Sequence, residues 1–123
     1  MSGVRVLTVH HEEDVRRAAL AVVSATPGFK SVGDATSAEE ALELAVELRP
    51  ALALVALSMP GIDGLETSAR LVAALPGTTV VLLYDSKEPN ANAVADVKGA
   101  TALQTDSLTP ESLQALWEER PEA

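Results

Sequence analysis

The sequence predicts an α/β fold, a three-layer sandwich in which a parallel sheet lies between two layers of helices. Two observations lead to it. Short apolar segments alternate with amphipathic segments in five successive pairs, and Pro or Gly separates several of these segments. Such alternation is typical of (βα)5 proteins with a parallel sheet. The second strand is the most polar and belongs at an edge, which favours the flavodoxin-like strand order 2-1-3-4-5.

Size and composition indicate one domain and exclude several kinds of site. The 123 residues are 47% hydrophobic but only 2% aromatic, so the core must consist mainly of Ala, Val and Leu. The absence of Cys excludes disulfides and thiolate metal sites. A net charge of -9 disfavours direct contact with nucleic acid, and no apolar run is long enough to span a membrane. We expect a soluble, cytoplasmic protein.

The first two strand–helix pairs occupy the first fifty residues. Residues 5–9 form the first predicted strand and residues 12–24 its helix, whose buried stripe is expected at Val15, Ala18, Ala19 and Val22. Residues 29–35 form the polar second strand. Ser37, with Glu40 three residues later, forms a capping-box pattern that starts the second helix, and Pro50 stops it.

The second half continues the alternation. Residues 51–57 are continuously apolar, as in a strand buried on both faces. The next predicted elements are helix 65–75, strand 79–84, helix 89–97 beginning with Pro89, and strand 100–104. Thr109-Pro110 starts the last helix. On that helix three apolar residues share a face that we assign to the core: Leu113, Leu116 and Trp117.

Ligands bind folds of this kind at the carboxyl ends of the strands. The residues at those ends are His10-His11, Ala56, Tyr84-Asp85 and Thr105-Asp106. A phosphate-transfer site there would require a carboxylate nucleophile and oxygen ligands for a magnesium ion. It would also require a cation that neutralises the developing charge.

The most specific motif is the loop Met59-Pro60-Gly61-Ile62-Asp63-Gly64-Leu65, in which Pro60, Gly61 and Gly64 are expected to supply unusual dihedral angles. Weaker matching segments occur in order at 5–7, 32–33, 39–45, 49–50 and 99–100. With these segments the chain resembles a response-regulator receiver domain of the NarL/FixJ type, from Val4 to about Leu116. The resemblance implies a role in two-component signalling.

The resemblance also indicates which functional positions have changed. The two acidic residues that follow the first strand of receivers correspond to His10 and His11, and the phosphoacceptor aspartate corresponds to Ala56. The family's hydroxyl residue, lysine and switch aromatic correspond to Tyr84, Thr105 and Ala102. An alanine cannot form an acyl phosphate, and neutral imidazoles are poor magnesium ligands. We therefore expect a degenerate receiver domain, not an enzyme, which needs no cofactor or metal and acts without phosphorylation.

Two alternatives remain open. The remodelled pocket could hold a small ligand and form a ligand-binding switch, with a polar lining of His10, His11, Tyr84 and Thr105. Alternatively, Asp63 or Asp85 could serve as a substitute acceptor in a conventional phosphorelay. We expect the Tyr84 ring to fill the vacated pocket. A metal site at the two histidines is disfavoured, because adjacent residues leaving a strand point to opposite faces.

The expected partners follow from the resemblance. We expect a receiver-like domain at 1–119, with 120–123 as a tail or the start of a linker. Receivers of this type usually precede a DNA-binding domain, so a covalently linked one is expected, and with it a role in transcription regulation. We also expect a homodimer through the region from Pro89 to Trp117, without direct contact of this domain with nucleic acid or membrane.

Overall fold

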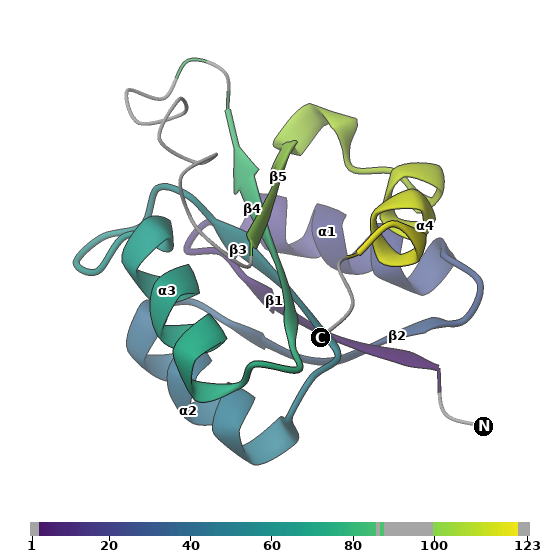
Figure 1. Ribbon diagram of the computed structural model, residues 1–123. Helices are drawn as coiled ribbons and strands as arrows, with labels where there is room; N and C mark the ends of the chain where they lie inside the picture. Colours follow the sequence, from purple (N-terminus) through teal and green to yellow (C-terminus); the bar gives the residue numbers. More distant parts are fainter. Residues whose placement is uncertain (1–2, 86, 88–99, 121–123) are drawn as a thin grey trace.

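Five parallel strands form the central sheet of the computed structural model, which describes residues 3–85, 87 and 100–120 (Figure 1). The strands are β1 (Val4–Val9), β2 (Phe29–Ala35), β3 (Leu52–Ala56), β4 (Thr79–Tyr84) and β5 (Ala100–Gln104). They lie in the order β2-β1-β3-β4-β5, and all neighbours pair in parallel. The predicted flavodoxin-like order, with the polar second strand at an edge, is confirmed.

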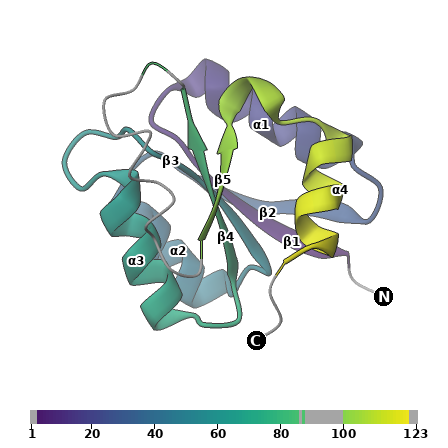
Figure 2. The same cartoon turned by 45° about the horizontal axis from the view of Figure 1, so that its top comes forward.

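Helices cover both faces of this sheet. The described ones are α1 (Glu13–Ala25), α2 (Ala38–Leu48), α3 (Gly64–Ala74), the 3-10 helix η2 (Thr105–Ser107) and α4 (Pro110–Glu118). Figures 1 and 2 show α2 and α3 on one face and α1 and α4 on the other. The helix predicted over 89–97 lies outside the described residues. None of the helices in the described part of the chain has the length and apolarity needed to cross a bilayer.

Each face of the sheet has its own apolar core. Leu7, Val55 and Leu71 belong to the core under α2 and α3, whereas Leu54 and Leu113 belong to the core under α1 and α4. Every residue of β3 is buried, as its continuous apolar run predicts. Trp117 packs against the second of these cores, and its ring makes a T-shaped contact with that of Phe29 at a centroid distance of 6.3 Å.

The buried stripe of α1 differs from the predicted one. Ala19 and Val23 are buried, whereas Ala18 is exposed. Arg16 stands three residues before Ala19 and seven before Val23, so it lies on the same face. There its guanidinium reaches Asp34 on β2, with 2.8 Å between Nε and Oδ2. The buried face of α1 thus includes one charged residue, Arg16, which the predicted stripe omitted.

The helix ends follow the sequence signals with one change. The Ser37 side chain accepts a hydrogen bond from the Glu40 amide at 3.2 Å, as a capping box requires. The Glu40 carboxylate, however, accepts from the amide of Thr36 rather than from that of Ser37. At the other end of α2, Arg49 adopts a left-handed conformation with φ 47° before Pro50.

Candidate functional site

A cleft of about 230 Å³ lies at the carboxyl ends of β1, β4 and β5. We call it the carboxyl-edge cleft; its lining residues are His10, Glu12, Val15, Tyr84, Asp85, Gln104, Thr105 and Asp106. Three of the four polar residues predicted for this pocket line it, whereas His11 does not. Asp85 and Asp106, which also stand at predicted strand ends, line it too, whereas the prediction missed Glu12 and Gln104.

His10 is the most constrained polar residue of the cleft. Its Nδ1 accepts a hydrogen bond from the Glu12 amide at 3.0 Å, so the neutral ring carries its proton on Nε2. Its ring stacks on that of His11, with centroids 5.1 Å apart and planes 14° apart. The expectation that the two histidines point to opposite faces is therefore wrong, because β1 ends at Val9 and the alternation of a strand no longer applies.

The surroundings of His10 disfavour its charged form. Burial lowers the pKa of His10 below its ordinary value of 6.5, and the neighbouring His11 and Arg16 lower it further. The Glu12 carboxylate acts in the opposite direction. His10 therefore presents a neutral imidazole near neutral pH.

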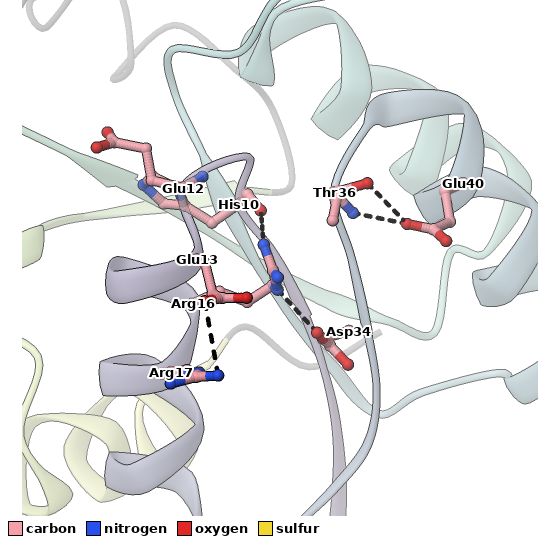
Figure 3. A network of polar contacts seen from close by, with 8 residues as sticks. All are labelled: His10, Glu12, Glu13, Arg16, Arg17, Asp34, Thr36 and Glu40. Carbon is pink, nitrogen blue, oxygen red and sulfur yellow. Dashed lines mark hydrogen bonds and ion pairs between the residues drawn. The ribbon is translucent and has the colours of Figure 1, made fainter.

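Arg16 connects this segment to the edge of the sheet. Figure 3 shows its guanidinium between His10 and Asp34. Nη1 donates to the His10 carbonyl at 3.0 Å, while Nε donates to the Asp34 carboxylate at 2.8 Å. The Arg16 side chain is only 13% exposed, which makes this pair less screened than an ordinary surface ion pair. The network holds the backbone after β1 against β2, and the predicted site did not include it.

Ala56 closes the end of β3 without a polar group. It is 2% exposed, and it belongs to the apolar core under α2 and α3. Gly64 packs directly against it, since a Cβ on Gly64 would come within 2.0 Å of the Ala56 carbonyl oxygen. The Gly64 amide donates to the Leu57 carbonyl at 2.8 Å. This close backbone approach fixes the start of α3 beside the end of β3.

The loop before α3 differs in one respect from its prediction. Gly61 has a φ of 79°, which favours glycine, but Gly64 has no such angle and is required for the close approach alone. Met59 is buried and Pro60 is exposed. Asp63 caps α3, because its Oδ1 accepts a hydrogen bond from the Glu66 amide at 3.0 Å.

Of the remaining predicted residues, Tyr84, Asp85 and Thr105 line the carboxyl-edge cleft, whereas Ala102 does not. Tyr84 is half-buried, packs against the core under α2 and α3, and forms a wall of the carboxyl-edge cleft. Thr105 lines the cleft at the start of η2. Ala102 is exposed on β5. Asp85, beside Tyr84, accepts a hydrogen bond from the Lys87 amide at 3.0 Å.

The donor atoms at this edge include the carboxylates of Glu12, Asp85 and Asp106. Ala56 has no side-chain oxygen, and Nδ1 of His10 is already hydrogen-bonded. Magnesium prefers carboxylate and water oxygens in octahedral geometry. Among the residues that the structure describes, no three His, Asp or Glu side chains are grouped so that they could hold a metal ion.

Comparison with known proteins identifies the family. Residues 6–115 match the model of the response regulator receiver domain. The chain belongs to this family. It is therefore the receiver domain of a two-component response regulator, as the sequence motifs imply. The matched segment covers every described strand except the first two residues of β1.

Two curated relatives of this receiver domain are much longer proteins. One is protein-glutamate methylesterase/protein-glutamine glutaminase 4 of Myxococcus xanthus, 34% identical over 110 residues, covering 89% of this chain and 31% of the relative. The other is the nitrate/nitrite response regulator protein NarL of Escherichia coli, 32% identical over 109 residues, covering 88% of this chain and 50% of the relative. The chain thus spans a half or less of these two proteins.

Solved structures agree with the fold. The NarL signal receiver domain of Mycobacterium tuberculosis superposes with a TM-score of 0.83 at 27% identity, covering 98% of this chain and all of that one (100%). The RcsB response regulator of Salmonella typhimurium gives a TM-score of 0.85 at 18% identity, covering 100% of this chain and 64% of that one. The second match shows the fold alone.

Proposed function

We propose that this receiver domain is a degenerate one, a regulatory and protein-interaction module that works without aspartyl phosphorylation. The observation that carries the proposal is Ala56, which stands at the end of β3 where the family resemblance places the phosphoacceptor aspartate. Its methyl group cannot act as a nucleophile.

The neighbouring residues support the same proposal. His10 and His11 stand at the positions of the magnesium-binding acids, and the stacked rings offer no carboxylate oxygen. Thr105 stands where the family has a lysine and brings no positive charge to the carboxyl-edge cleft. Instead, the cleft is lined by Glu12, Asp85 and Asp106, which would repel a phosphoryl group.

The two substitute acceptors are both engaged in local hydrogen bonds. Asp63 caps α3, and Asp85 accepts from the Lys87 amide. A phosphoryl group on either carboxylate would disturb the hydrogen bond that it makes. We therefore rank a conventional phosphorelay with a substitute acceptor below phosphorylation-independent regulation.

Intact mass spectrometry after incubation with acetyl phosphate or phosphoramidate and magnesium tests the proposal. We expect no phosphoryl adduct, whereas a conventional receiver treated in parallel becomes modified. A stoichiometric adduct would refute the proposal. In that event, the variants Asp63→Asn and Asp85→Asn identify the acceptor, since the adduct disappears in only one of them.

A ligand-binding switch is the second candidate, and the carboxyl-edge cleft favours it. The cleft offers the neutral His10 imidazole, the Tyr84 hydroxyl and the Thr105 hydroxyl within about 230 Å³. A thermal-shift screen across cell metabolites tests this function. A ligand that stabilises the wild type but not Thr105→Val would establish it, and no stabilisation by any metabolite would leave only the interaction module.

The output is proposed from the relatives. We propose that the domain at 1–119 is followed, through a linker starting at 120–123, by a DNA-binding domain, and that the whole protein regulates transcription. We also propose a homodimer through the region from Pro89 to Trp117, part of which lies outside the described residues. Light scattering after size exclusion tests the dimer, and a constant monomer mass at all concentrations would exclude it.

A further inference from the structure

A second cleft lies at the opposite edge of the sheet, where β1, β3 and β4 begin. Its volume is about 440 Å³. We call it the amino-edge cleft; its lining residues are Gly3, Arg5, Arg49, Pro50, Ala51, Ala74, Leu75, Pro76, Gly77 and Thr78. They come from the start of β1 and from the connections that lead into β3 and β4. None of the residues proposed for signalling lies here.

The charge of this cleft is opposite to that of the whole chain. The chain has 18 acidic and 9 basic residues, yet two arginines and no carboxylate line the amino-edge cleft. Within the described residues, Arg16, Arg17 and Arg70 each pair with a carboxylate, whereas Arg5 and Arg49 form no ion pair. Two guanidinium groups without a carboxylate partner thus line one cleft of an acidic protein.

The two arginines are held together by the fold. Arg5 Nη1 donates to the Arg49 carbonyl at 3.1 Å, which leaves the other N–H groups of Arg5 for a ligand. Arg49 is the one non-glycine residue with positive φ in the described part of the chain, and its amide donates to the Ala45 carbonyl at 2.8 Å. Its exposed side chain lines the amino-edge cleft from the end of α2.

The rest of the lining is mostly apolar. Pro50 and Leu75 are buried, and Pro76 is exposed beside them. The Thr78 hydroxyl donates to the Pro50 carbonyl at 2.8 Å, which joins the two connections that form the walls. A ligand in this cleft would therefore meet two arginines and several apolar residues.

We propose that the amino-edge cleft binds a small organic oxyanion. A phosphate or carboxylate group lies against the guanidinium groups of Arg5 and Arg49, whose planar N–H pairs match either anion. The organic body of the ligand lies against Pro50, Leu75 and Pro76. The Arg49-Pro50 segment, which the receiver resemblance includes without a role, thereby acquires a function. This inference does not depend on how the domain is regulated.

Amide NMR titration of the whole chain at constant ionic strength tests the proposal. The probes are inorganic phosphate, phenyl phosphate and benzoate. We expect shifts at Ala51, Gly77 and Thr78, with phenyl phosphate binding about tenfold more tightly than inorganic phosphate because its ring becomes buried. The tighter of phenyl phosphate and benzoate identifies the head group. Shifts confined to His10 and Thr105, or none with any probe, would overturn the proposal.

A pair of double variants distinguishes binding at the amino-edge cleft from a general effect of the protein's net charge. Arg5→Gln/Arg49→Asn removes both guanidinium groups, and Asn tolerates the left-handed conformation. Arg17→Gln/Arg70→Gln removes the same charge from two ion-paired arginines outside the cleft. We expect the first variant to lose the titration and the second to keep it, with both melting cooperatively. Equal weakening in the two variants would reduce the effect to net charge and refute the site.

Discussion

The two edges of the same sheet carry clefts of opposite character. At the carboxyl edge, Glu12, Asp85 and Asp106 line a cleft together with His10, whose pKa is lowered by burial. At the amino edge, Arg5 and Arg49 line a cleft without carboxylates. Because all strands of a parallel sheet run the same way, its two edges are built from different connections and can diverge independently. In this chain the cleft at the carboxyl edge is lined by carboxylates, and the cleft at the amino edge is lined by guanidinium groups.

The two edges also differ in how their polar groups are used. At the carboxyl edge, Nδ1 of His10, the Arg16 guanidinium and the Asp63 carboxylate all bind protein partners. At the amino edge, Arg5 makes one hydrogen bond to a carbonyl and the Arg49 guanidinium makes none to the described residues. These three groups at the carboxyl edge are therefore already engaged, while the amino edge retains guanidinium donors that can bind a ligand.

The two edges should differ most in how much the free energy of unfolding changes when a glycine is replaced by alanine. In Gly64→Ala, the new Cβ would lie 2.0 Å from the Ala56 carbonyl oxygen and 2.6 Å from Cα of Leu57. Both are backbone atoms, so a change of side-chain rotamer cannot relieve the clash. We expect a loss of about 3 kcal/mol or more in the free energy of unfolding, measured by urea denaturation.

Gly77→Ala is the matched control at the amino edge. Its new Cβ would meet no atom within 4 Å, and its backbone lies outside the left-handed region. We expect no loss, or a gain of up to about 1 kcal/mol, because the unfolded chain loses freedom. Equal destabilisation by the two variants would show that the close packing of α3 against β3 is not what distinguishes the edges.

Replacing an arginine at each edge should give a smaller difference in the free energy of unfolding. Arg16→Gln removes a charged hydrogen bond to the His10 carbonyl and an ion pair with Asp34, in a side chain that is largely buried. We expect a loss of about 1–2 kcal/mol in unfolding free energy, reduced by the exposure of Asp34. Arg5→Gln removes one exposed hydrogen bond and should cost less than about 1 kcal/mol. The reverse order in urea denaturation would contradict the assigned roles.

Backbone strain at the amino edge gives the third prediction. Arg49→Gly relieves a left-handed conformation with φ 47°, partly offset by the greater freedom of glycine in the unfolded chain. We expect a net gain of about 0.5 kcal/mol. Arg49→Ala, which removes the guanidinium but keeps the strain, should show no gain. If Arg49→Ala stabilised the protein as much, charge rather than backbone conformation would explain the effect.

Much of the fold could be predicted from local signals. The buried run of β3, the cap at Ser37 and the stop at Pro50 each depend on residues close together in the sequence. The pairing of Arg16 with Asp34 could not be predicted in this way, since it depends on how α1 is rotated on the sheet. The stacking of His10 on His11 was missed because strand alternation ends with β1.

The site predictions show the same division between local and distant information. Five polar lining residues of the carboxyl-edge cleft follow from the rule that ligands bind at strand ends: His10, Tyr84, Asp85, Thr105 and Asp106. The amino-edge cleft could not be inferred, because Arg5 and Arg49 are 44 residues apart and only the pairing of β1 with β3 brings them together. Sequence motifs indicate a site where a family keeps one, but they do not reveal a site assembled from separate connections.

The smallest expected effect is the pH dependence contributed by His10. Its pKa is lowered in the fold, so below pH 6.5 the unfolded state binds a proton that the folded state resists. Stability from this residue should thus fall as the pH drops through 6.5, a trend that Glu12 opposes and that His11 and Arg16 reinforce. In urea denaturation between about pH 7.5 and about pH 5.5, His10→Gln should lose less stability than the wild type.

Asp85 and Asp106 line the same cleft and are unchanged in this variant. No histidine or carboxylate lines the amino-edge cleft, so benzoate binding there should remain constant over this range. A parallel loss of stability in His10→Gln would assign the pH dependence to other groups.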